Sequence, residues 1–225
     1  MLIYKMKLLL TSSGITNKSI EKALYELLGK PFKEARLLFV PTAANAETGD
    51  KSWLVNDMNN IRLLGFKSFE IIDIAVVPQN IWMPRFKKAD VLVFGGGDVH
   101  YLLAKMRESG LEIELHTMLQ SKVYVGISAG SMVTARKISL SYADILYYEK
   151  VGEFPVVNGL GYVDFEIRPH LHSKWFPKVT ISYLSDLAKK NNRPFYAIDD
   201  ASAVIVNGEK VRVVSEGMWK IFNEQ

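Results

Sequence analysis

Short, continuous apolar runs alternate with segments of helical periodicity through the first half of the chain. The apolar runs lie at 5–11, 35–40, 68–74, 91–94 and 122–126. Between the first two, Ile20, Ala23, Leu24 and Leu27 recur at helical spacing before Gly29, as on one face of an amphipathic helix. Strands that are apolar at every position are buried on both faces. The alternation therefore predicts an α/β fold, with a mainly parallel sheet covered by helices on both sides.

The second half of the chain has shorter elements. We expect apolar strands at 154–157, 162–167 and 195–198, a helix over about 179–190, and a hairpin over 203–214 that turns on Asn207-Gly208. No repeat or low-complexity linker interrupts the sequence. The 225 residues are long enough to bury a sizeable core, so we expect a single domain over 1–225.

Composition excludes several classes of function. The formal charge is only +4, and the basic residues are scattered along the chain. The densest basic cluster, 85–88 with Lys105 and Arg107, is interpreted as solvated surface. We therefore expect no nucleic-acid partner. The absence of cysteine removes disulfides, thiolate metal sites and a cysteine nucleophile. The apolar run at 8–10 is too short to span a membrane, and we expect a cytoplasmic protein with no membrane partner.

The pentapeptide Gly126-Ile127-Ser128-Ala129-Gly130 has the pattern Gly-x-Ser-x-Gly. It follows a predicted buried strand and precedes a predicted helix, the context of a nucleophile elbow. Such a turn exposes the serine hydroxyl, while the Ala129 amide at the helix N-terminus can stabilise an oxyanion. The structural alternative is an ordinary glycine-flanked turn with a capping serine.

A second glycine run, Gly95-Gly96-Gly97, follows the strand at 91–94. Backbone amides at the carboxyl end of a parallel strand can face a ligand, so Gly96 or Gly97 is expected to complete an oxyanion hole with Ala129. Asp98 is expected to cap the next helix. The spacing is not that of a dinucleotide-binding fingerprint.

A serine nucleophile needs a base, and the chain has four histidines. His116 and His100 fall on predicted helices. His170 and His172 lie in Arg168-Pro169-His170-Leu171-His172, where a strand ends and a loop begins. His170 directly follows the rigid proline and is the predicted base. A metal site on the His-x-His pair lacks further histidine or cysteine ligands nearby, so we expect no metal.

These residues resemble the peptidase E family, which also includes cyanophycinases. The likeness rests on the Gly-x-Ser-Ala-Gly turn, the triple glycine one unit earlier and a Pro-His about forty residues after the serine, and it extends from 39–42 to 198–201. It implies a three-layer α/β/α sandwich, class I glutamine amidotransferase-like, with a Ser-His-acid triad and no cofactor. By that resemblance Ser128 is the nucleophile and His170 the base.

The acid that orients the histidine is harder to assign. Asp144 is the prediction, because peptidase E-like proteins are expected to carry their acid between the serine and the histidine. Glu149 in the same segment is the second choice, and Asp199 or Asp200 at a strand end is the third.

Two residues depart from the pattern of the family. Asp98 stands where asparagine commonly follows the glycine run, and Arg168 replaces the more usual asparagine before Pro169-His170. Both are candidate substrate-binding residues. Arg168 could bind a substrate carboxylate with two parallel hydrogen bonds, or instead pair with Glu166.

The sequence thus predicts a serine-type peptidase acting on amide bonds of short peptides, and dipeptides with an acidic N-terminal residue are one candidate class of substrate. The expected partner is a small peptide substrate, and a homodimer is one assembly that the sequence leaves open. Two alternatives from other classes remain: a catalytically silent binding or regulatory module on the same fold, and a flavodoxin-like nucleotide or flavin binder.

Overall fold

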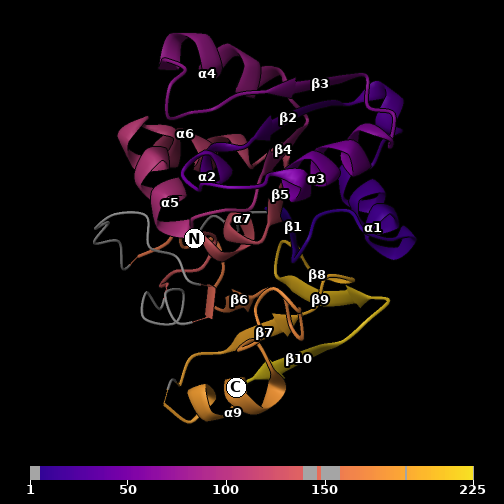
Figure 1. The fold of residues 1–225 in the computed structure, drawn as a ribbon. Coiled ribbons are helices and arrows are strands. Elements are labelled where there is room, and N and C mark those ends of the chain that lie inside the picture. Colours follow the sequence, from indigo (N-terminus) through magenta and orange to yellow (C-terminus); the bar gives the residue numbers. More distant parts are fainter. Residues whose placement is uncertain (1–5, 139–145, 148–157, 191, 225) are drawn as a thin grey trace.

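A computed structural model describes residues 6–138, 146–147, 158–190 and 192–224. A seven-stranded sheet lies at its centre (Figure 1). In spatial order its strands are β3 (Ser68–Ile71), β2 (Arg36–Val40), β4 (Val91–Phe94), β5 (Val123–Ile127), β1 (Lys7–Thr11), β8 (Ser202–Asn207) and β9 (Lys210–Ser215). The first five pair in parallel, and the last two are antiparallel. The predicted mainly parallel sheet is confirmed.

Helices cover both faces of this sheet (Figure 1). On one face lie α1 (Lys18–Leu28) and α3 (Ser52–Arg62), and on the other α4 (Gln79–Lys88), α5 (Val99–Glu108) and α6 (Leu111–Met118). Two short helices, α2 (Thr42–Asn45) and α7 (Ala129–Met132), follow the carboxyl ends of β2 and β5, and a 3-10 turn spans Phe32–Glu34. The molecule is therefore an α/β/α sandwich, as expected.

The alternation of side chains along β1 shows why both faces are covered. Leu9 packs with Leu24 of α1 on one face, whereas Leu8 and Leu10 belong to the other cluster, with Leu102 of α5. All three strand leucines are fully buried. A strand with no polar face can be stable only between two apolar layers.

A smaller sheet lies beside the central one (Figure 1). It contains β6 (Glu166–Arg168), β7 (Phe195–Ile198) and β10 (Trp219–Phe222), with α9 (Ile181–Ala188) against β10. β6 runs parallel to β7, and β10 antiparallel to it. The chain passes from β7 directly into β8, so the segment around Asp199 and Asp200 joins the two sheets.

Most predicted elements are present, but several differ. The strand expected over 68–74 spans only Ser68–Ile71, and β10 was not predicted. The strand expected over 162–167 is limited to Glu166–Arg168, and the run at 154–157 lies outside the described residues. Helix α4 was not predicted, because Pro84 within it removes a backbone donor. Its buried Trp82 and Phe86 hold it against the sheet, so tertiary packing outweighs the proline. The cluster at 85–88 is solvated surface except for Phe86.

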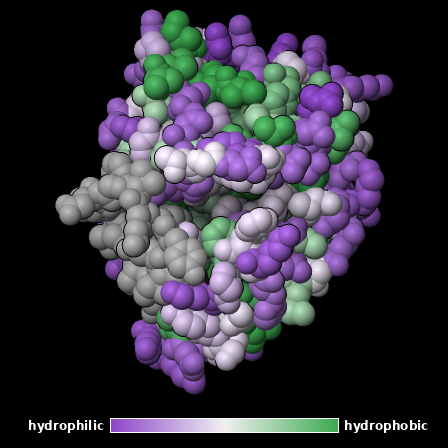
Figure 2. All heavy atoms as spheres, viewed as in Figure 1, coloured by the Kyte–Doolittle hydropathy of each residue, from purple (hydrophilic) through white to green (hydrophobic). Residues whose placement is uncertain are grey.

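The surface is mixed in character. Figure 2 shows hydrophilic residues over most of one face, with hydrophobic side chains gathered near α4 and β3. Across the described ranges, no helix is both long and apolar enough to cross a membrane.

The close approach of β5 and α7 gives a test of the fold. A Cβ on Gly126 would lie 2.6 Å from the Gly130 carbonyl oxygen, so Gly126→Ala should destabilise the protein by about 3 kcal/mol through overpacking. Gly65→Ala is the matched control, since its Cβ would meet nothing within 4 Å and only its positive φ of 75° is strained, at a cost of about 1 kcal/mol. Urea unfolding measures both; equal losses would contradict the packing argument.

Candidate active site

Ser128 occupies a strained turn between β5 and α7. Its φ of 47° and ψ of −108° lie outside the regions that a serine ordinarily adopts. The backbone is held there by two contacts with the end of β1: the Ser128 amide donates to the Thr11 carbonyl at 3.1 Å, and the Ser131 hydroxyl donates to the same oxygen at 2.7 Å. The strand, the strained turn and the helix have the geometry that a nucleophile elbow requires.

Glycine is required on both sides of the serine, because a Cβ at either position would clash with neighbouring backbone atoms. At Gly130 a Cβ would lie 2.0 Å from the Phe94 carbonyl oxygen, and at Gly126 it would meet the backbone of Gly130 and Ser131. The elbow thus packs backbone to backbone against β4, which leaves the serine hydroxyl on the open side of the turn.

His170 lies between the serine and a carboxylate. Its Nε2 is 2.9 Å from the Ser128 Oγ, and its Nδ1 is 2.7 Å from the Asp200 Oδ1. With the proton assigned to Nδ1, the ring donates to Asp200 and accepts from Ser128. The centroids of the His170 and Phe176 rings are 4.9 Å apart, so this ring contact helps to fix the orientation of the imidazole.

Ser12, at the turn after β1, supports this arrangement. Its hydroxyl donates to the Asp200 Oδ1 at 2.6 Å and accepts from the His170 amide at 2.8 Å. Ser12 was not among the residues predicted for the site. The only available signal was its position, since Ser12 follows a parallel strand at the same sheet edge as Ser128.

The electrostatics favour an ionised Asp200. Burial acts to raise the pKa of its carboxyl, but the hydrogen bond and charge of His170, together with the Ser12 hydrogen bond, lower the pKa overall. Asp200 is therefore an anion near neutral pH and can stabilise a protonated imidazole.

The expected oxyanion-hole residues lie next to Ser128, the candidate nucleophile. A Cβ on Gly96 would be 3.4 Å from the Ser128 Cβ, and Gly97 has a φ of 125° that favours glycine. Ala129 is the first residue of α7, so its amide has no intrahelical acceptor. In the part of the chain that the structure describes, the amides of Gly96, Gly97 and Ala129 donate to no protein acceptor.

The carboxylates considered from the sequence have different outcomes. Asp144 and Glu149 lie outside the described residues. Asp199 is used in the turn between β7 and β8, where it accepts hydrogen bonds from the Ala201 amide and the Ser202 hydroxyl. Among the described candidates, Asp200 is the one that contacts His170.

The two candidate substrate-binding residues are both buried. Arg168 is 2% exposed; its Nη2 is 2.6 Å from the Glu166 Oε2, and its guanidinium lies over the Phe195 ring. It therefore has a carboxylate partner within the protein, which is the structural alternative considered for it. Asp98 caps α5 as expected, accepting from the Tyr101 amide at 2.7 Å.

A further carboxyl, Asp57 of α3, lies close to the site and was not predicted. It is 7% exposed, and its Oδ1 would be 3.6 Å from a Cβ on Gly14, in the turn that carries Ser12. Burial, and secondarily the charge of Asp200, raise the pKa of Asp57 to about 7.

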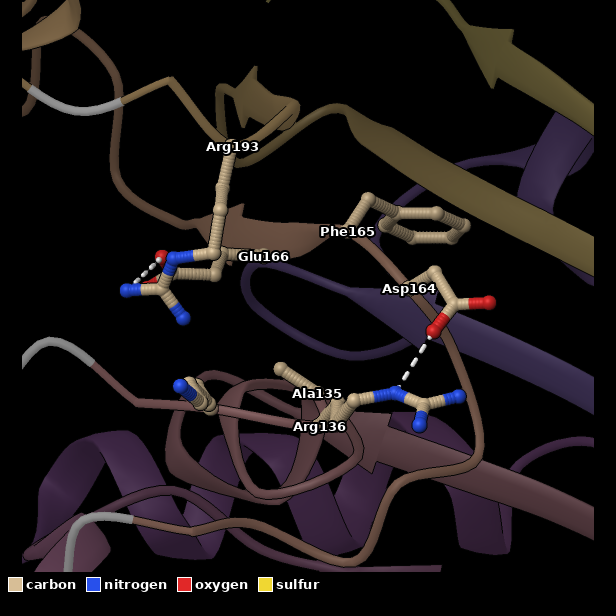
Figure 3. A pocket seen from close by; sticks show the side chains of 7 residues that line it. Ala135, Arg136, Asp164, Phe165, Glu166 and Arg193 are labelled. Atoms are coloured by element: carbon tan, nitrogen blue, oxygen red, sulfur yellow. Dashed lines mark hydrogen bonds and ion pairs between the residues drawn. The ribbon is translucent and has the colours of Figure 1, made fainter.

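A small pocket of about 160 Å³ lies elsewhere, at β6 (Figure 3). Four of its charged side chains form ion pairs: Arg136 pairs with Asp164 at 2.8 Å, and Arg193 pairs with Glu166 at 3.1 Å. Neither Ser128 nor His170 lines it. In the described ranges, no group of three or more histidine or acidic side chains is arranged to hold a metal ion.

Comparisons with known proteins indicate one family. The model of peptidase family S51 matches residues 8–214. An uncharacterized peptidase from Pasteurella multocida is 25% identical over 177 residues, covering 77% of this chain and 82% of its own length. An uncharacterized peptidase from Listeria monocytogenes is also 25% identical, over 182 residues, with the same coverage.

Solved structures share the fold. The crystal structure of a candidate peptidase E protein from Listeria monocytogenes EGD-e superposes with a TM-score of 0.78 at 21% identity, covering 94% of this chain and 99% of that one. A peptidase from an acI-B1 Actinobacterium gives a TM-score of 0.69 at 20% identity, covering 97% and 92% respectively.

The buried Asp57 predicts an unusual dependence of stability on pH. Because its folded pKa of about 7 lies above the ordinary 3.8, the folded state binds more protons between these values, and stability falls as pH rises through them. Asp57→Asn removes this penalty and should gain up to about 4 kcal/mol at pH 8 but little at pH 4.

Urea unfolding of both proteins at pH 4 and pH 8 measures the difference. Asp186→Asn is the control, since it removes the same charge from an exposed position on α9 and should show no such gain at high pH. A gain from Asp57→Asn that is equal at the two pH values would contradict the raised pKa.

Proposed function

The chain belongs to peptidase family S51, and we propose that it hydrolyses amide bonds of short peptides with a triad of Ser128, His170 and Asp200. The observation that carries the proposal is the position of the imidazole, 2.9 Å from the Ser128 Oγ and 2.7 Å from the Asp200 Oδ1. These distances are within hydrogen-bond reach on both sides, as a general base and its orienting acid require.

Acylation follows from this geometry. The Ser128 Oγ attacks the peptide carbonyl carbon and forms a C–O bond, while His170 Nε2 takes the hydroxyl proton. The protonated imidazole is stabilised by the Asp200 carboxylate. When the tetrahedral intermediate collapses, the C–N bond breaks and His170 delivers the proton to the leaving amine, leaving an ester on Ser128.

Deacylation reverses the roles. His170 takes a proton from water, whose oxygen attacks the ester carbonyl; the C–O bond to Ser128 then breaks, and the proton returns to the serine oxygen. In both steps the free amides of Ala129 and of Gly96 or Gly97 donate to the oxyanion. This chemistry requires no cofactor.

Asp200 takes the role that the sequence analysis gave to Asp144. Two observations favour Asp200: its hydrogen bond to His170 Nδ1, and its lowered pKa. Ser12 adds a third support, because its hydroxyl hydrogen-bonds both the Asp200 carboxylate and the His170 backbone amide. These two bonds fix the position of Asp200 relative to His170.

The proposal stops at short peptides. Arg168 was the residue predicted to bind an acidic group of the substrate. Its guanidinium is paired with Glu166, so it does not support a preference for an acidic N-terminal residue. Family membership and the Ser128–His170 contact favour a hydrolase over a silent module or a flavodoxin-like binder. A cytoplasmic location and a homodimer stay predictions from the sequence.

Ser128→Ala should abolish amide hydrolysis, by several orders of magnitude in kcat, because the hydroxyl is the nucleophile. The fold should be retained, because among the described residues the Ser128 hydroxyl forms a hydrogen bond only with His170. Labelling with a fluorophosphonate reports the nucleophile directly: the wild-type protein should be modified at Ser128 and the variant not. Wild-type activity in the purified variant would refute the assignment.

Asp200→Asn should lower kcat by about a thousandfold or more, because an amide at this position no longer holds the imidazole in the tautomer that accepts the serine proton. Asp144→Asn is the matched comparison and should retain most of the activity. The reverse outcome, an active Asp200→Asn and an inactive Asp144→Asn, would assign the acid to Asp144.

A further inference from the structure

Trp53 lies beside the candidate nucleophile and one of the expected oxyanion-hole glycines. It is the second residue of α3, and it is partly exposed. A Cβ built on Gly96 would lie 3.5 Å from the Trp53 Cζ3 and 3.4 Å from the Ser128 Cβ. Because both distances are measured from one point, the edge of the indole and the serine Cβ are no more than about 7 Å apart.

The surroundings of Trp53 hold its ring in this place. The ring packs against the apolar cluster that contains Leu9 of β1 and Phe39 of β2. The Lys51 ammonium lies 5.8 Å from the ring centroid. Lys51 is itself 3.8 Å from the Glu47 carboxylate, and it donates to the Glu47 carbonyl oxygen at 3.0 Å. Trp53 is therefore a supported apolar surface beside the serine.

The strand order gives the candidate site two sides. β5, which leads into Ser128, lies between β4 and β1. Gly96 follows β4, and Trp53 lies against it. Ser12 follows β1, and its hydroxyl accepts from the His170 amide at 2.8 Å. The candidate base is thus held on the β1 side of the serine, and the indole lies on the β4 side.

These two sides orient a bound peptide. The leaving amine takes its proton from the Nε2 of His170, so the leaving group lies on the β1 side of Ser128. The carbonyl oxygen is directed to the amides of the oxyanion hole. The third substituent of the carbonyl carbon belongs to the residue on the acyl side of the scissile bond. This residue is left on the β4 side, where Trp53 lies.

The charges around Trp53 disfavour an acidic side chain in that position. Burial raises the pKa of the Glu47 carboxyl; the charge of Lys51 opposes the rise, and the charge of Asp98 adds to it. One turn along α3 from Trp53, burial raises the pKa of Asp57 to about 7. Ionised carboxyls are thus already unfavourable in this region, and a substrate carboxylate would meet the same penalty.

We propose that Trp53 forms the wall of a subsite for a large apolar side chain, such as that of leucine or phenylalanine, on the residue whose carbonyl Ser128 attacks. The inference rests on the proposed function and names its class of substrate. An apolar side chain on the indole leaves water without giving up a hydrogen bond, and aromatic rings pack well against one another. Trp53 is then a specificity residue, which takes no part in making or breaking bonds.

The kinetic test compares the dipeptides Phe-Gly, Leu-Gly and Ala-Gly by the release of glycine. The wild-type kcat/KM should be about 10- to 100-fold higher for the two large residues than for alanine, the usual effect of filling an apolar subsite. Trp53→Ala should lower this ratio by about tenfold or more, and Trp53→Phe should keep most of it. Tyr25→Ala, which removes a partly exposed ring from α1, should not change it. A ratio near one in the wild-type protein, or one that survives Trp53→Ala, would overturn the proposal.

Asp-Gly tests the opposite specificity. An acidic side chain beside Trp53 would compete with Glu47 for Lys51, so the wild-type protein should cleave Asp-Gly more slowly than Phe-Gly. A preference for Asp-Gly would overturn the proposal, and its loss in Lys51→Met would assign the subsite to an acidic residue.

Fluorophosphonate labelling separates a binding defect from damage to the candidate triad. A probe with a small alkyl group has no side chain for the subsite, so Trp53→Ala should still be labelled at Ser128 while its preference for large residues falls. Loss of labelling would show that Trp53 supports the serine itself rather than the substrate, which would also overturn the proposal.

A binding measurement decides the inference without turnover. Calorimetry of the Ser128→Ala protein should detect tighter binding of Phe-Gly than of Ala-Gly, and adding Trp53→Ala should abolish the difference. Equal binding of the two dipeptides to the Ser128→Ala protein would overturn the proposal. If the wild-type protein is not labelled and cleaves no amide, the proposed function fails, while this comparison still decides whether Trp53 binds an apolar side chain.

Discussion

The strained backbone at Ser128 is the constraint on which the site depends. A serine with a φ of 47° persists only where its surroundings hold it, and here β1 and β4 do so. Thr11 accepts from the Ser128 amide and the Ser131 hydroxyl, while Gly130 packs on the Phe94 backbone. The candidate nucleophile is thus held by β1, β4 and β5, three buried strands of the central sheet, rather than by a loop.

The first strand has a second function through Ser12. The Ser12 hydroxyl hydrogen-bonds both the Asp200 carboxylate and the backbone amide of His170. The end of β1 therefore holds the Ser128 turn through Thr11 and holds Asp200 and His170 through Ser12. The same turn continues to Gly14, next to Asp57. One short segment therefore connects the elbow, the candidate acid Asp200 and the buried Asp57 carboxyl.

The sequence predicted those features that depend on local chemistry. Continuous apolar runs indicated the parallel strands, and the glycines around Ser128 and the proline before His170 marked the two chain turns that bring these residues together. The carboxylate that contacts His170 could not be found in this way, because Asp199 and Asp200 are adjacent and only packing decides which of them turns toward the imidazole. Helix α4 was missed for the converse reason, since the buried Trp82 and Phe86 stabilise a segment that its proline disfavours.

The candidate triad is divided between two sheets. Ser128 ends a strand of the central sheet, His170 follows β6 of the smaller one, and Asp200 lies on the connection from β7 to β8. Catalytic competence therefore depends on how the sheets are docked, and not only on each being folded. If the smaller sheet opens locally, the base is withdrawn while the elbow stays intact, so hydrolysis would be lost in a partially unfolded state that retains the parallel core.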